Sequence, residues 1–252
     1  MITYPKIQFI HIPSASNPFL VIDKPAGIPS APLSSDDTDN ALSFAAEKFP
    51  EILHVHGRKE IEHGLVHRID TATRGLLLIA VSQNAYDAFC RAQEQDLFIK
   101  RYRAECTQNT SCADRLGGFP VISHTYCETL LSGSKITISS FFRAYGTGRG
   151  AVRPVTETSH TAAKKKTGTR LYTTVLEYEG ENRGRISVDC TITAGYRHQV
   201  RCHLAWIGLP IIGDPVYNPN IDAHSSTSGM HFTACSLQFP HPLTGKSLIF
   251  KL

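Results

Sequence analysis

Residues 63–75 concentrate side chains that could carry out acid–base or nucleophilic chemistry. This short stretch holds two histidines, two arginines and one aspartate, just before an apolar run. An aspartate at the entry to a strand is most often a turn or cap residue. Here Arg68 and Arg74 flank Asp70, and nearby positive charge keeps a carboxylate ionised even where water is excluded. An ionised, fixed carboxylate can act as a nucleophile or as a general base, which makes Asp70 a candidate catalytic residue.

A second candidate segment covers residues 194–205, where a predicted helix carries basic side chains. Three- and four-residue spacing places His198 and Arg201 on the same face of that helix as several apolar residues. An arginine on an otherwise apolar face must bind an anion or reach solvent, because an unpaired buried charge is costly. Asp70 is a natural partner for Arg201. Another carboxylate, or exposure of the guanidinium to solvent, is the alternative.

Apolar and β-branched runs predict the elements that position these residues. We expect strands at 19–23, 76–80, 99–107, 135–142, 171–179, 185–193, 230–236 and 246–251. We expect helices at 40–49, 82–96 and 197–207, and loops at 24–32, 51–62 and 143–170. Strands outnumber helices and do not alternate regularly with them, so an α+β fold is favoured over a doubly wound sheet.

The positive charge of the chain is concentrated in one segment. The chain has 252 residues, with 26 Lys and Arg against 22 Asp and Glu. Residues 141–201 alone hold 11 basic and 5 acidic residues. This excess predicts a face that binds a polyanion, although the three lysines at 164–166 could equally belong to a solvated loop.

Composition also limits the class of protein. No apolar run approaches the roughly 20 residues that a membrane helix needs, and residues 1–17 do not form a secretory signal. The seven cysteines include no C-x-x-C pair, which argues against a zinc site and a disulfide framework. Scattered, reduced cysteines are typical of a cytosolic protein, so we expect a cytoplasmic location.

Five sequence blocks, the fourth of which consists of two neighbouring segments, resemble in order the RluA-type pseudouridine synthases. Residues 23–29 resemble the pattern N-K-P-x-G, residues 67–75 resemble H-R-L-D-x-x-T-S-G, and residues 100–104 match K-x-Y-x-A. Residues 195–203 and 208–217 match T-G-R-x-H-Q-I-R-x-H and G-x-P-I-x-G-D-x-x-Y, and residues 241–245 resemble H-P-x-x-G. The resemblance runs from about residue 19 to residue 251, which covers nearly the whole chain.

The resemblance implies an enzyme that isomerises uridine to pseudouridine in structured ribosomal or transfer RNA, without a metal or cofactor. Asp70 would be the catalytic aspartate, Tyr102 would stack on the target uracil, and Arg201 would pair with Asp70. Arg68 would enter the RNA and help to hold the flipped nucleotide. The remaining basic residues of the two motifs would contact RNA: His67, Arg74, Arg197 and His198.

The implied fold is the pseudouridine synthase catalytic fold, a mixed, mostly antiparallel, bent sheet with helices around a central cleft. We expect residues 1–252 to form one such domain, without a separate S4-like RNA-binding domain. Two positions depart from the family patterns. Arg74 stands where serine is usual, and Arg197 follows Tyr196 where the pattern has its arginine one residue earlier.

Two other functions are compatible with these residues. The chain could be a catalytically inactive relative that binds RNA during ribosome assembly, although such a protein would not need Asp70, Tyr102 and Arg201 together. It could also be a hydrolase that uses Asp70 with His67 or His198, but no serine or cysteine nucleophile motif accompanies them.

Overall fold

A computed structural model describes residues 7–220 and 229–252 of the chain. The fold consists of two compact units. The first comprises Met1–Lys100 and Thr233–Leu252, and the second comprises Arg101–Phe232. The two boundaries fall inside strands β4 (Ile99–Cys106) and β9 (Phe232–Pro240).

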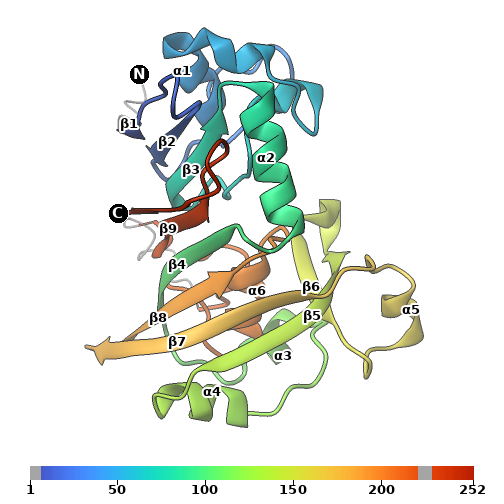
Figure 1. Cartoon of the computed structure of the whole chain (residues 1–252). Helices are drawn as coiled ribbons and strands as arrows, with labels where there is room; N and C mark the ends of the chain where they lie inside the picture. Colours follow the sequence, from blue (N-terminus) through green and yellow to red (C-terminus); the bar gives the residue numbers. More distant parts are fainter. Residues whose placement is uncertain (1–6, 221–228) are drawn as a thin grey trace. The chain divides into compact units, whose positions relative to one another are not determined.

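The first unit is built on β1 (Gln8–His11), β2 (Phe19–Lys24) and β3 (Arg74–Ala80), which pair in that order and antiparallel (Figure 1). The start of β3 pairs parallel with β9, and β10 (Ser247–Lys251) pairs antiparallel with β9. Strand β2 is buried along its whole length, and β3 is buried after its first residue. Continuous apolar runs therefore form the two strands at the centre of this unit.

Two capped helices cover the first unit. Helix α1 (Ala41–Lys48) begins at Asn40, whose Oδ1 accepts the Ser43 N–H at 2.9 Å, and helix α2 (Gln83–Glu94) packs against β3. The expected helices at 40–49 and 82–96 are thus confirmed. The expected loop at 51–62 is partly wrong, because short 3-10 helices η1 (Pro50–His54) and η2 (Glu60–Glu62) occupy it.

The second unit contains a sheet with the strand order β4-β8-β7-β5-β6. Its antiparallel strands are β5 (Ile136–Tyr145), β6 (Ala151–Val155), β7 (Tyr172–Asn182) and β8 (Arg185–Ile192), and they lie side by side in the order β8-β7-β5-β6 (Figure 1). Its helices are α3 (Cys112–Leu116), α4 (Thr125–Leu131), α5 (Thr161–Lys164) and α6 (Gln199–Trp206). Together the two units confirm an α+β fold with mostly antiparallel strands.

The prediction of a continuous loop over 143–170 is wrong. Strand β5 continues to Tyr145, the 3-10 turn η3 (Thr147–Arg149) follows, and β6 returns along β5. Proline, glycine and arginine in this segment mask its strand character in the sequence. Pro154 fits because β6 ends the sheet order and needs no second row of backbone hydrogen bonds.

The described residues contain no helix that is long and apolar enough to cross a membrane. All seven cysteines are free thiols, and burial raises the pKa of the Cys112 thiol to about 12. Buried thiols of this kind are protonated at neutral pH and serve as packing groups.

Candidate active site

The loop that carries Asp70 leads directly into β3, as the sequence predicts. Asp70 is partly exposed, and its carbonyl accepts the Thr73 N–H at 2.9 Å, which closes a tight turn before the strand. Ser30 supports the loop from the proline-rich segment: its hydroxyl donates to the Ile69 carbonyl at 2.7 Å and accepts the Ile69 N–H at 3.1 Å. The constrained loop after β2 thus fixes the backbone beside Asp70.

Lys24 is a second, fully buried support of this loop. Its Nζ donates to the carbonyls of Pro25 at 2.9 Å, Ile28 at 2.6 Å and Thr71 at 3.3 Å. Burial lowers the pKa of Lys24 to about 8, and the nearby charges of Asp70 and Asp23 partly offset that effect. The lysine therefore ties two loops together and places positive charge near Asp70.

Arg74 forms an ion pair that accounts for its departure from the family pattern. Its Nη2 lies 2.8 Å and its Nε 3.2 Å from Oδ2 of Asp23, which is buried at the end of β2. The hydrogen bonds that Arg74 donates to the Asp23 carboxylate raise the pKa of Arg74. Asp23 and Arg74 occupy the positions where the quoted patterns have asparagine and serine, so both members of this ion pair depart from the patterns. The predicted contact of Arg74 with RNA stays a prediction, because the guanidinium already has a carboxylate partner.

Arg68 and His67 are neighbours in the chain, but Arg68 is exposed and His67 is buried. Arg68 is exposed and pairs with Glu62 at 3.0 Å, which leaves part of its guanidinium open to a ligand. His67 is buried, its Nε2 accepts the Leu78 N–H at 3.2 Å, and burial lowers its pKa to about 3. The buried, neutral ring of His67 has a structural role, so its predicted contact with RNA has no support from its position.

Tyr102 lies on β4 with its ring stacked on Phe232. The ring centroids are 5.0 Å apart with an interplanar angle of 11°, and Tyr102 is buried. The period-two pattern of the strand correctly placed Tyr102 on the inner face. The stacking partner fixes the ring as a flat platform, whereas stacking on a uracil stays a prediction.

Arg201 lies on α6 in a buried ion pair with Asp214. Its Nε is 2.7 Å from Oδ2 and its Nη2 is 2.8 Å from Oδ1, and both side chains are almost completely buried. Asp214 Oδ1 also accepts the backbone N–H groups of Val216 and Tyr217. Another carboxylate, an alternative left open above, thus binds Arg201. The pairing of Arg201 with Asp70 stays a prediction, because the two residues belong to different units.

Arg197 and His198 precede α6 and bind within the second unit. The Nη2 of Arg197 donates to the carbonyls of Arg149 and Ala151. Nδ1 of His198 lies 3.1 Å from the Tyr217 hydroxyl. Arg197 is exposed, so it is available to a polyanion, while His198 is partly buried.

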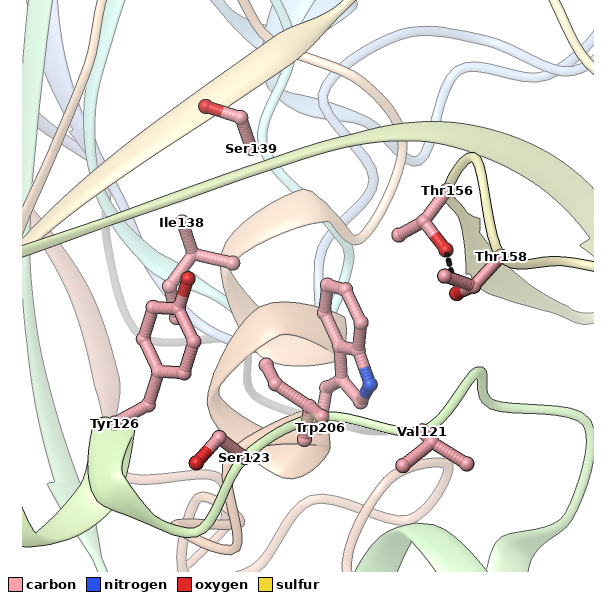
Figure 2. Close-up of a pocket in the computed structure, with 9 residues that line it drawn as sticks. Val121, Ser123, Tyr126, Ile138, Ser139, Thr156, Thr158 and Trp206 are labelled. Carbon is pink, nitrogen blue, oxygen red and sulfur yellow. Dashed lines mark hydrogen bonds between the residues drawn. The ribbon is translucent and has the colours of Figure 1, made fainter.

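The second unit also contains a cavity of about 240 Å³ whose lining includes the single tryptophan of the chain (Figure 2). The Trp206 indole N–H donates to the Pro120 carbonyl at 2.8 Å, and the Thr156 and Thr158 hydroxyls lie 2.9 Å apart. The lining is neutral and contains none of the predicted site residues. The residues that line the cavity are Val121, Ile122, Ser123, Tyr126, Ile138, Ser139, Thr156, Thr158 and Trp206. Among the described residues, no group of three or more histidine, cysteine or acidic side chains could hold a metal ion.

Sequence reasoning missed the roles of Lys24, Asp214 and Phe232. Lys24 and Asp214 lie inside blocks that carry the family resemblance, and that was the available signal for both. Phe232 has no such signal, because its stacking on Tyr102 depends on a contact between residues far apart in the chain.

Comparison with known proteins identifies the family. The family model for RNA pseudouridylate synthase matches residues 18–206. Ribosomal large subunit pseudouridine synthase D of Zymomonas mobilis is 27% identical over 244 residues, which cover 92% of this chain and 65% of that protein. The protein of the same name from Blochmanniella floridana is 25% identical over 247 residues, covering 90% of this chain and 64% of the relative. This chain therefore spans less than two thirds of the length of these relatives.

Solved structures agree on the fold. Human RNA Pseudouridylate Synthase Domain Containing 1 matches with a TM-score of 0.64 and 18% identity, over 98% of this chain and 83% of that one. Human RNA Pseudouridylate Synthase Domain Containing 4 matches with a TM-score of 0.61 and 17% identity, over 97% of this chain and 87% of that one. The family model covers most of the chain, including Asp70, Tyr102 and Arg201, and the fold is shared with these domains. This chain belongs to the RNA pseudouridylate synthase family.

Proposed function

We propose that this chain is an active RNA pseudouridine synthase of the RluA type. The observation that carries the proposal is that the family match includes Asp70, on a loop held by the buried Lys24 and by Ser30. A family member that had lost catalysis would have no need of an intact aspartate on so well supported a loop. In this proposal residues 1–252 act as one catalytic domain in the cytoplasm.

The proposed reaction exchanges one bond of the target nucleotide for another. The bond between N1 of uracil and C1′ of ribose breaks, the base turns, and C5 bonds to C1′. The proton leaves C5, and N1 gains a proton, so no redox partner is required. Asp70 would assist by attacking the nucleotide or by removing a proton from its ribose.

Tyr102 and Arg201 would act beside this carboxylate. A uridine must leave its base stack before its glycosidic carbon can react, and a flipped base needs an aromatic platform. Stacking on Tyr102 would supply about 1–3 kcal/mol. Arg201 would hold the Asp70 carboxylate ionised and oriented, and Arg68 would help to hold the nucleotide outside the helix.

The proposed substrate is a structured RNA, with ribosomal RNA favoured over transfer RNA. Two relatives are named for the large ribosomal subunit, which supports the first choice. The basic excess in residues 141–201 supports contact with phosphates, which positions RNA without determining sequence specificity.

Mapping pseudouridines in total RNA from cells with and without the gene tests this proposal. We expect at least one site to disappear without the gene and to return with the wild-type chain. Asp70→Asn should not restore it, because an amide can neither attack nor accept a proton as a carboxylate does.

Asp36→Asn is the matched control, since it makes the same change in an exposed loop of the same unit. It should restore the modification fully. Normal modification by Asp70→Asn would refute the catalytic role, and an unchanged map in the deletion strain would favour the inactive RNA-binding relative.

A further inference from the structure

Four arginines gather around the β5–β6 hairpin of the second unit. Arg143 on β5 and Arg153 on β6 are direct cross-strand partners. Arg149 lies in the turn between the strands, and Arg197 reaches this turn from the start of α6. We call these four residues the arginine cluster.

Arg153 and Arg197 brace the hairpin through carbonyl oxygens. The buried Arg153 donates to the carbonyls of Gly117 at 2.6 Å, Val152 at 2.9 Å and Leu116 at 3.0 Å. Arg197 donates to the Ala151 carbonyl at 3.1 Å and to that of Arg149. Carbonyl groups satisfy the donors but carry no net charge, so the positive charge of both arginines stays uncompensated.

Arg143, Arg149 and Arg197 all reach solvent, and Arg197 uses its Nη2 to hold the turn. Arg149 is exposed, and Arg143 is half-buried, with its guanidinium 5.0 Å from the centre of the Tyr145 ring. The Arg153 guanidinium lies 4.2 Å from the same ring centre. The buried Nε of Arg143 has no hydrogen-bond partner within the described ranges, while its Nη2 donates to the Gly118 carbonyl at 3.4 Å. The tyrosine thus holds two like charges close together.

No carboxylate in the part of the chain that the structure describes neutralises the cluster. Among residues 7–220 and 229–252, none of the four guanidiniums lies within 4.0 Å of an acidic side chain, whereas Arg103 and Arg185 of the same unit each pair with one. Like charges on neighbouring strands destabilise a sheet unless an external anion offsets them. Guanidinium groups match the geometry and charge of phosphate oxygens.

We propose that the arginine cluster binds the phosphodiester backbone of RNA. The inference rests on the proposed function for the identity of the polyanion, and it assigns the contact to a particular hairpin. Arg143 and Arg149 make the phosphate contacts, and Arg153 and Arg197 keep the turn rigid. The contact is independent of base sequence.

The test measures RNA binding without turnover at several salt concentrations. The probe is a fluorescein-labelled RNA stem-loop with a single-stranded uridine tail, and fluorescence anisotropy gives its Kd. Each lost phosphate contact should reduce the slope of log Kd against log salt by about 0.7–0.9. For Arg143→Gln/Arg149→Gln the loss of affinity between 50 and 200 mM salt should therefore be about 7- to 12-fold smaller than for the wild type.

Arg103→Gln/Arg185→Gln is the matched control, because it removes the same charge from paired, similarly exposed arginines of the same unit. Its slope should equal that of the wild type. The single variant Arg149→Gln, in an exposed turn, should show half the effect and guards against misfolding of the double variant. An unchanged slope in both cluster variants, or an equal change in the control, would overturn the inference.

This outcome is separable from that of the proposed function. If the wild-type chain formed no pseudouridine but the cluster variants still showed the smaller salt slope, catalysis would be refuted and the RNA surface would stand. If pseudouridine formed and the slopes were equal, the surface would be refuted alone.

Discussion

The buried pair of Arg201 and Asp214 allows a quantitative prediction. Asp214→Asn keeps the shape of the side chain but removes the charge that faces Arg201 at 2.7 and 2.8 Å. Removing the charge of one member of a buried ion pair costs about 3–5 kcal/mol. The asparagine oxygen can still accept the Val216 and Tyr217 N–H groups, so we expect about 3 kcal/mol of lost unfolding free energy.

Urea unfolding followed by circular dichroism measures this loss, provided that the slope of free energy against urea is the same for each variant. The double variant Arg201→Met/Asp214→Asn should be less destabilised than the sum of the two single changes, because neither member of the pair then remains as a buried charge. Asp87→Asn in α2 serves as the control for the amide substitution and should leave stability nearly unchanged. A loss of unfolding free energy below about 1 kcal/mol for Asp214→Asn would refute the reasoning. A double variant whose loss equals the sum of the two single losses would also refute it.

Two further predictions concern the pair of Asp23 and Arg74 and two of the buried histidines, His67 and His203. Arg74→Ser should lower the free energy of unfolding by only about 1 kcal/mol, because Arg74 is half exposed. In thermal unfolding, the double variant Asp23→Asn/Arg74→Ser should regain most of that lost stability. Equal losses in the single and double variants would contradict the pairing. The pKa of His67 and of His203 is lowered to about 3 by burial, so below pH 6.5 the unfolded chain takes up protons that the folded chain does not. The free energy of unfolding should fall as pH falls from 6.5 towards 3, by roughly 1.4 kcal/mol per pH unit for each histidine. His203→Gln should remove one of these two contributions, which urea titrations at several pH values would measure. An unchanged dependence of stability on pH in that variant would show that the His203 ring is not the source.

Local pattern was sufficient for most of the elements that position the candidate site. The apolar run before residue 80 predicted the core of β3, and alternation predicted β4 with Tyr102 facing inward. Capping residues predicted α1 and α2 within a few residues. These features depend on neighbours in the chain, which a sequence displays directly. Strand β6 was not predicted, because its own residues do not show a strand pattern. It forms a strand only because β5 pairs with it along its length.

The candidates for the reactive residues also came from sequence alone, through motif blocks that place Asp70, Tyr102 and Arg201 in the family pattern. The partners of the charged residues could not be identified from the sequence. Asp23 lies 51 residues from Arg74 and Asp214 lies 13 residues from Arg201, and several other carboxylates were equally available in the sequence. The energy of an ion pair depends on distance and burial, and both arise only when the chain folds. Sequence thus determined which groups could do chemistry, while the tertiary structure decided which charges pair with a carboxylate and which, as in the arginine cluster, have no such partner among the described residues.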